Sequence, residues 1–157
     1  MNTLPFYQWI AGTWISAIMR NSQWGFACVE TVHLLALAVL GGAVILTDMR
    51  VLGAGLRSQT PASVAAALRP LLLGSVSAMV ITGGLLVASD PLKYYASPAF
   101  QWKMILFLIA VLFYATLYPR KVLFNEHRTT AGKRIAATIS LSLWLGIGLA
   151  GRAIGLI

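Results

Sequence analysis

Four long apolar stretches, separated by short links that hold most of the charged residues, dominate the pattern of this sequence. Each stretch has the roughly 20 residues that an α-helix needs to cross the hydrocarbon core of a membrane. A shorter, interrupted apolar segment with Trp9 and Trp14 precedes them. Because tryptophan rings favour the membrane interface, we expect an interfacial helix there, with a fifth span as the alternative. The predicted elements are an interfacial helix over residues 4–19 and spans over residues 24–50, 62–89, 98–120 and 134–156.

Composition supports the same interpretation. The chain of 157 residues is 59% hydrophobic and only 10% charged, and its mean hydropathy is +0.80. Soluble domains usually carry about 25% charged residues. We therefore predict one all-α integral membrane domain over residues 1–157, a four-transmembrane-helix bundle. The sequence contains no phosphate-binding loop, dinucleotide fingerprint or nucleophile elbow, which disfavours an enzyme.

The net charge of +8 arises from basic residues that flank the apolar stretches. Such placement favours membrane-flanking charges and contact with anionic lipids over nucleic-acid binding. The links after the first and third spans carry eight basic residues, and the opposite side carries four. The positive-inside rule then predicts that the more basic links are cytoplasmic and that both termini face the periplasm or the outside. Asp48 and Arg50 would mark the cytoplasmic boundary of the first span.

A small polar cluster interrupts the first span. Glu30 and His33 are three residues apart and lie on neighbouring positions of one helix face, roughly 9 and 13 Å below its outer end. Lys103 and Arg152 fall near the same end of the third and fourth spans. Ionisable residues within a membrane are costly and usually functional. We therefore expect an outward-facing polar pocket that binds or passes a small ligand or a metal ion, or a membrane subunit of a periplasmic redox system.

The few potential metal ligands in the sequence limit which metal sites this pocket could form. His127, the only other histidine, would lie roughly 27 Å deeper than His33, so one chain cannot supply two histidines to one haem. His33 with Met79, which falls at a similar depth, remains a candidate pair for haem b iron or, with Cys28 or another methionine, for copper. An anion or a quinone headgroup is an equally open ligand, and a haem-b/quinone electron carrier is the alternative function.

A structural role would leave a similar pattern. The four charged residues would then form a network that pins the helices together, a modest stabilisation in lipid. Small residues along the fourth span, such as Gly146 and Gly151, would pack against partner helices. Besides membrane lipids, the expected partners are a second copy of the chain or another membrane or periplasmic protein.

Several short motifs resemble an uncharacterised family of small bacterial inner-membrane proteins. They are the tryptophan-containing N-terminal segment, E-x-x-H-L-L-x-L from Glu30, D-x-R-V-L-G from Asp48, Phe100-Gln101-Trp102-Lys103, and the ending from Trp144 to Arg152. That family is distantly similar to the four-helix part of copper-resistance D-type membrane proteins. The resemblance implies shared polar residues at His33, Asp48, Arg50, Lys103 and Arg152. In that family the third span often ends with a histidine close behind an asparagine, whereas here Asn125 and His127 come later.

Overall fold

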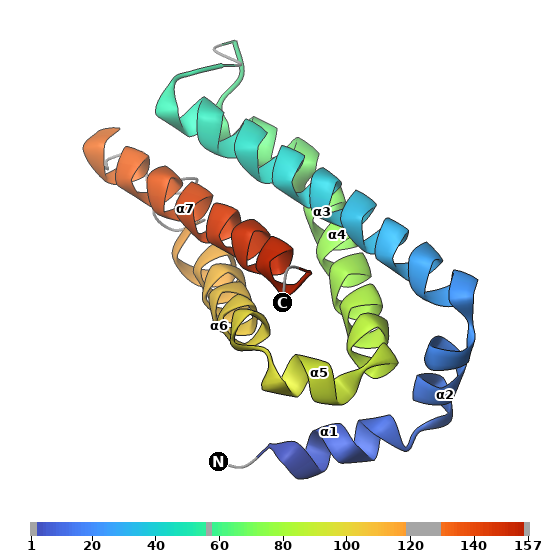
Figure 1. Cartoon of the computed structure of the whole chain (residues 1–157). Coiled ribbons are helices and arrows are strands. Elements are labelled where there is room, and N and C mark those ends of the chain that lie inside the picture. Colours follow the sequence, from blue (N-terminus) through green and yellow to red (C-terminus); the bar gives the residue numbers. More distant parts are fainter. Residues whose placement is uncertain (1–2, 56–57, 119–129, 156–157) are drawn as a thin grey trace.

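The structure, a computed structural model, describes residues 3–55, 58–118 and 130–155. Over these residues every regular element is a helix and no strand occurs (Figure 1). The predicted all-α fold is therefore confirmed.

Four helices are long and apolar enough to cross a membrane, as the sequence predicted. A π-helical segment, η1, continues the third of them without a break. The four long helices and this segment are α3 (Gln23–Leu52), α4 (Pro61–Ser89), α6 (Pro98–Leu112), η1 (Phe113–Leu117) and α7 (Thr130–Ile154). Large apolar side chains cover the outside of the bundle, among them Leu34, Ile81 and Leu145. An apolar exterior of this extent is typical of a multi-pass membrane protein.

Short polar residues determine where the long helices begin. The hydroxyl groups of Ser22, Thr60 and Ser97 accept hydrogen bonds from backbone N–H groups at the starts of α3, α4 and α6, at 3.0, 3.1 and 3.3 Å. Proline follows Thr60 and Ser97 at the first helical position, where its fixed φ suits the helix. At the other end of α3, Gly53 adopts a left-handed φ of 82°, which ends the helix.

The N-terminal segment differs from the prediction, because it forms two short helices where one was expected. Helix α1 (Leu4–Ala11) and helix α2 (Trp14–Asn21) are separated by Gly12 and Thr13. The Thr13 hydroxyl accepts from the N–H of Ser16 at 3.3 Å and donates to the Ile10 carbonyl at 2.7 Å, so it starts α2 in a new direction. Each helix has eight residues, about 12 Å, which is too short for a span.

These short helices close one end of the bundle. Helix α1 packs against α5 (Pro91–Ala96), where Tyr7 and Tyr95 lie with ring centroids 5.4 Å apart, and α2 packs against α3 and α4 (Figure 1). Trp9 and Trp14 are 68% and 72% exposed. Exposed tryptophan rings at one end of an apolar bundle suit the membrane interface.

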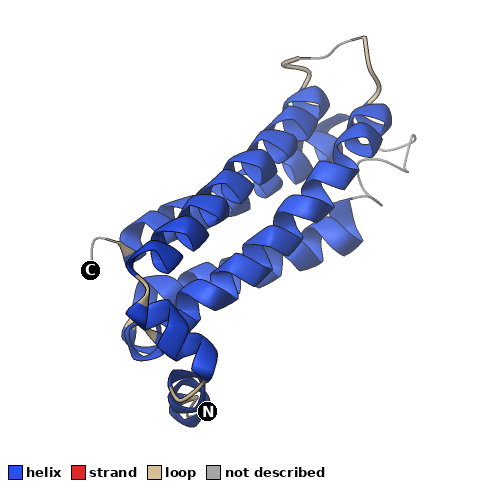
Figure 2. Ribbon diagram, turned by 90° about the vertical axis from the view of Figure 1, so that its right-hand side faces the viewer, coloured by secondary structure: helices blue, strands red, loops and turns tan. Residues whose placement is uncertain are grey.

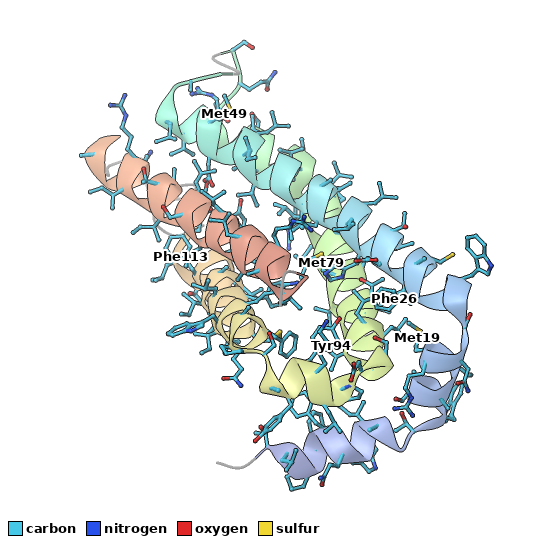
Figure 3. All side chains as sticks on the ribbon, in the orientation of Figure 1. Met19, Phe26, Met49, Met79, Tyr94 and Phe113 are labelled. Atoms are coloured by element: carbon cyan, nitrogen blue, oxygen red, sulfur yellow. The ribbon has the colours of Figure 1, made fainter. Side chains whose placement is uncertain are left out.

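The long helices pack as two pairs, α3 with α4 and α6 with α7 (Figure 2). Contacts between α3 and α7 join the pairs. Ala36, Leu40, Val44 and Met79 form the central apolar cluster, and Met79 lies in the interior in Figure 3. Polar side chains are buried on either side of this cluster along α3, which gives the bundle two distinct polar regions.

Candidate functional site

The first polar region centres on His33 of α3, which is only 8% exposed. Its Nδ1 lies 2.8 Å from the hydroxyl oxygen of Thr82 on α4. That hydroxyl donates its single proton to the Ala78 carbonyl at 2.6 Å, so it can only accept from the imidazole. Nδ1 therefore carries a proton, and the neutral imidazole keeps its electron pair on Nε2. In metal sites, a hydrogen bond from the ring nitrogen that does not bind the metal commonly orients the histidine ligand.

Lys103 supplies a positive charge to the same region. It lies on α6, is partly buried, and acts electrostatically on the His33 ring. Its side chain runs beside Gly151 of α7, where an added Cβ would lie 3.5 Å from Nζ. Likewise, a Cβ at Gly83 of α4 would lie 3.4 Å from His33 Cε1. The His33 ring and the Lys103 stem thus lie beside two glycines, at distances where an added Cβ would be in ordinary contact, and four helices contribute to the region.

Glu30 and Arg152, the other two predicted ligand residues, are both exposed. Glu30 is near Tyr94 of α5, and burial together with the charges of Glu30 and Asp90 raises the pKa of the Tyr94 phenol. The structure therefore places His33 in the interior, within electrostatic range of the partly buried Lys103, and places Glu30 and Arg152 on the surface near that end of the bundle.

The predicted metal ligands lie in different surroundings. Met79 is buried in the central apolar cluster, and Cys28 is exposed on α3. Within the described parts of the chain, no group of three or more histidine, cysteine or acidic residues could hold a metal ion. His127 lies outside the described residues.

The second polar region surrounds Asp48 near the other end of α3, and sequence reasoning did not predict it. The sequence reasoning predicted Asp48 at the cytoplasmic boundary of the first span and said nothing of its helix face; in the structure its side chain is completely buried between helices. One carboxylate oxygen, Oδ1, accepts a hydrogen bond from the buried Tyr118 hydroxyl at 2.5 Å. The Tyr118 ring stacks on Tyr114, with centroids 4.5 Å apart and planes 10° from parallel. Arg50, by contrast, points away and donates from Nε to the Gln59 carbonyl.

Three polar atoms of this second region lack hydrogen-bonding partners among the described residues: Asp48 Oδ2, Tyr114 Oη and Ser140 Oγ. The Ser140 hydroxyl lies close enough to the Asp48 carboxylate to interact with it electrostatically. However, neither Ser140 Oγ nor Asp48 Oδ2 makes a hydrogen bond of ordinary geometry with the described residues. A buried polar group without a partner costs about 1–3 kcal/mol. The sequence held a signal for this burial, because Leu40, Val44 and Asp48 follow one another at four-residue intervals on one helix face.

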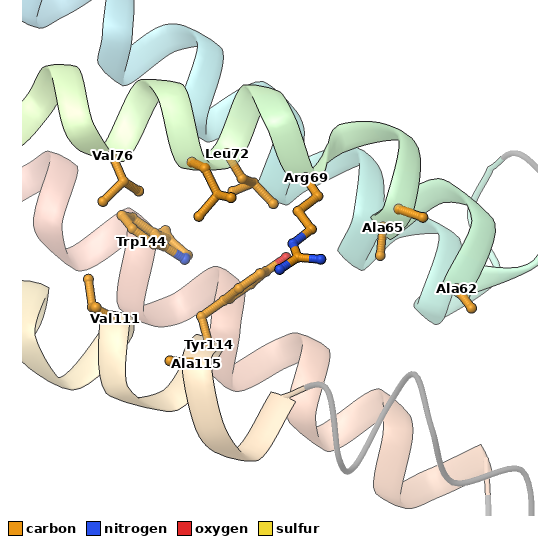
Figure 4. Close-up of a pocket in the computed structure, with 11 residues that line it drawn as sticks. Ala62, Ala65, Arg69, Leu72, Val76, Val111, Tyr114, Ala115 and Trp144 are labelled. Carbon is orange, nitrogen blue, oxygen red and sulfur yellow. The ribbon is translucent and has the colours of Figure 1, made fainter.

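A cleft of about 610 Å³ opens beside the second region, between α4 and the end of α6 (Figure 4). Tyr114 and Trp144 line it together with residues of α4, among which Arg69 is the only charged side chain. In Figure 4 the Arg69 guanidinium points across the cleft toward the Tyr114 hydroxyl.

The four long apolar helices suggest a small multi-pass helical membrane protein. Residues 6–157, nearly the whole chain, match a family described as a family of unknown function (DUF6644), and the chain belongs to that family. Comparison with curated proteins and with solved structures gives no match. A likeness to copper-resistance D-type proteins is not shown by these comparisons.

Proposed function

We propose that this protein binds a small oxygen-bearing ligand between His33 and Lys103, as a non-enzymatic protein of the bacterial inner membrane. The observation that carries the proposal is the hydrogen bond from Nδ1 of the buried His33 side chain to Thr82, which leaves Nε2 as an acceptor without a hydrogen-bond partner among the described residues. An imidazole that is fixed in one orientation can present its free nitrogen to a ligand. Ionisable residues inside a membrane bundle usually have such a functional role.

The charge of Lys103 favours an anionic or carbonyl-bearing ligand over a bare metal cation. Its ammonium donates to oxygen and repels a metal ion at the neighbouring imidazole. A quinol headgroup matches both partners, because its hydroxyl donates to Nε2 while a further oxygen accepts from Nζ. Copper held by His33 and Met79 fits less well, since Met79 packs in the apolar cluster.

Haem b is the second candidate, and the orientation of His33 favours it. A single axial bond from Nε2 would be supported by the Nδ1 hydrogen bond to Thr82, and Lys103 would pair with a propionate. The two candidates differ in a simple property, because haem gives a stoichiometric Soret band and a quinone does not.

The test is retention of a small molecule by protein extracted in mild detergent. Native mass spectrometry of the wild type should show the additional mass of a bound small molecule, and a visible spectrum should show whether that molecule is haem. The variants His33→Ala and Lys103→Gln should not retain the molecule. Lys93→Gln is the matched control, because Lys93 is an exposed lysine on α5 near the same end of the bundle. A wild type that carries no small molecule and is not stabilised by added decylubiquinone or haem would contradict the proposal.

The proposed orientation places the His33 region toward the periplasm, on the strength of the excess of basic residues at the opposite end. Single cysteines introduced into a Cys28→Ser background test it. An impermeant maleimide should label Lys93→Cys in cells with a permeabilised outer membrane, and should label Ser58→Cys only after the inner membrane is opened. The reverse labelling pattern would invert the orientation.

A further inference from the structure

The cleft beside the second polar region has walls of different chemistry along its length (Figure 4). On α4 its lining residues recur every three or four positions, so one helix face forms a wall. The wall begins with small side chains at Ala62 and Ala66, reaches the guanidinium of Arg69, and continues with apolar side chains to Val76. Val111 and Trp144 complete the apolar part.

The length of α4 places Arg69 at the edge of the hydrocarbon region. At about 1.5 Å per residue, the 29 residues of α4 extend over about 44 Å, well beyond a hydrocarbon core of about 30 Å. The uncharged stretch from Pro70 to Ser89 measures about 30 Å and matches that core. Arg69 then lies at headgroup level, the alanines lie beyond it, and the apolar part of the cleft lies at acyl-chain depth.

We propose that this cleft binds one membrane lipid with an anionic headgroup. The phosphate accepts hydrogen bonds from the Arg69 guanidinium, whose planar group of donors suits phosphate geometry. One acyl chain lies against Val76, Val111 and Trp144. The volume of about 610 Å³ falls within the usual range of ligand sites, about 300–1,000 Å³. The small side chains near Arg69 leave space for the headgroup, which larger residues would fill.

The positive charge of Arg69 favours a lipid with an anionic headgroup. The described acidic residues are Glu30, Asp48 and Asp90, and the structure shows no ion pair between any of them and Arg69. Asp48 is instead held by Tyr118, and Asp90 caps α5 through the N–H of Lys93. A zwitterionic lipid offers the same acyl chain but a weaker attraction to an arginine at the headgroup level.

Trp144 provides the probe for the test, because it is the only tryptophan that lines the cleft. Trp9, Trp14, Trp24 and Trp102 are all highly exposed and can be replaced by phenylalanine to leave Trp144 as the sole emitter. Lipids with brominated acyl chains quench a tryptophan on contact. Brominated phosphatidylglycerol, present as a small fraction of a phosphatidylcholine bilayer, should quench Trp144 at least twofold more than brominated phosphatidylcholine at the same fraction.

Arg69→Gln should abolish that difference between the two lipids. Arg134→Gln is the matched control, an exposed arginine near the start of α7 outside the cleft, and should retain it. Ala66→Phe, which fills the headgroup space, should reduce quenching by the anionic lipid. Inorganic phosphate in excess should leave the quenching unchanged, since the acyl chain contributes to binding.

Equal quenching by the two brominated lipids in the wild type would overturn the proposal. So would a preference for phosphatidylglycerol that survives Arg69→Gln, because the headgroup would then not be bound at Arg69. Reversal of the quenching by inorganic phosphate alone would mean that the site binds a free anion and would overturn the lipid assignment.

Discussion

The two polar regions of the bundle differ in how completely their buried groups are hydrogen-bonded. At the His33 end, a chain of two hydrogen bonds runs from the imidazole through Thr82 to the backbone of α4, and only Nε2 is left over. At the Asp48 end, only one oxygen of a fully buried carboxylate has a partner; its second oxygen and the hydroxyl oxygens of Tyr114 and Ser140 have none among the described residues. The first arrangement orients one atom toward a ligand. The second concentrates unpaired polar atoms, which costs stability unless a proton, a water molecule or an ion joins them.

Position along α3 explains much of this difference. Both regions lie on the face that packs against the other helices, and Leu40 separates them. The His33 end is bordered by glycines, so side chains from other helices fit beside it. The Asp48 end is bordered by the stacked rings of Tyr114 and Tyr118, which fill space but offer few hydrogen bonds. Small neighbours thus favour a ligand site, and aromatic neighbours favour an enclosed polar group.

The largest expected effect comes from Leu40→Ala, which removes the completely buried side chain between the two regions. We expect a loss of about 2 kcal/mol in unfolding free energy, at the low end of the range for soluble proteins, because lipid offers no aqueous driving force. Denaturation in a mixed-detergent titration measures it. Leu34→Ala, at an exposed position on α3, should change stability little. Equal losses in the two variants would contradict the assigned core.

Tyr118→Phe should have the next largest effect, because it deprives the Asp48 carboxylate of its hydrogen-bond donor. The expected loss lies at the low end of the usual range of about 1–3 kcal/mol, below that of Leu40→Ala, in the same titration. Tyr95→Phe, which retains the ring packed against Tyr7, is the control. The double variant Tyr118→Phe/Asp48→Leu should recover most of the loss, since both polar partners are then absent. Without such recovery, the Tyr118 ring and not its hydroxyl group would be the stabilising element.

Thr82→Val should cost less, about 1 kcal/mol, which is typical of a hydrogen bond between membrane helices. Its main effect should be on function, because the imidazole loses the acceptor that holds a proton on Nδ1. We expect the retained small molecule to dissociate more readily from this variant in native mass spectrometry. Thr82→Ser keeps the hydroxyl and should restore retention. Normal retention by Thr82→Val would show that the orientation of His33 does not matter.

The smallest effects should come from the glycines around the first region. At Gly151 an added Cβ would be in ordinary contact with the flexible Lys103 side chain, so Gly151→Ala should change stability by less than about 0.5 kcal/mol. At Gly83 the neighbour is the His33 ring, which is fixed by Thr82 and cannot move as freely. Gly83→Ala should therefore weaken ligand retention more than Gly151→Ala does. The opposite order would make Lys103, and not His33, the more tightly held partner.

The sequence predicted the helices better than the sites. Long uncharged stretches require helices in a membrane, so the four candidate spans follow from composition and length. His33 and Lys103 stood out as ionisable residues among apolar ones, which made one half of the first region predictable. Thr82 was not predictable from the sequence, because threonine hydroxyls in apolar helices usually donate hydrogen bonds to the backbone of their own helix. Only the packing of α3 against α4 reveals its second partner, His33.

The sequence reasoning considered how far Asp48 lies from the end of the span but not which helix face it occupies, so it missed the burial of this side chain. A charged residue near a span end usually marks the membrane boundary, which stays the prediction for Asp48 and Arg50. The four-residue spacing from Leu40 and Val44 shows in addition that Asp48 faces the core, as the structure confirms. The break between α1 and α2 also had a signal, a glycine followed by a threonine, that the run of apolar residues obscured.

The π-helical segment η1 has a consequence for comparing this chain with other members of its family. Such a segment holds one residue more than the same stretch of α-helix, and it lies between Lys103 and Tyr118. Deleting one residue there would turn the segment into ordinary α-helix and leave Tyr118 facing Asp48, whereas the same deletion within α6 would rotate Tyr118 by about 100° around the helix. Lys103, which precedes the segment, would stay in place. In an alignment, a single-residue gap within positions 113–117 would therefore be compatible with relatives that keep both the tyrosine–aspartate pair and the region around His33.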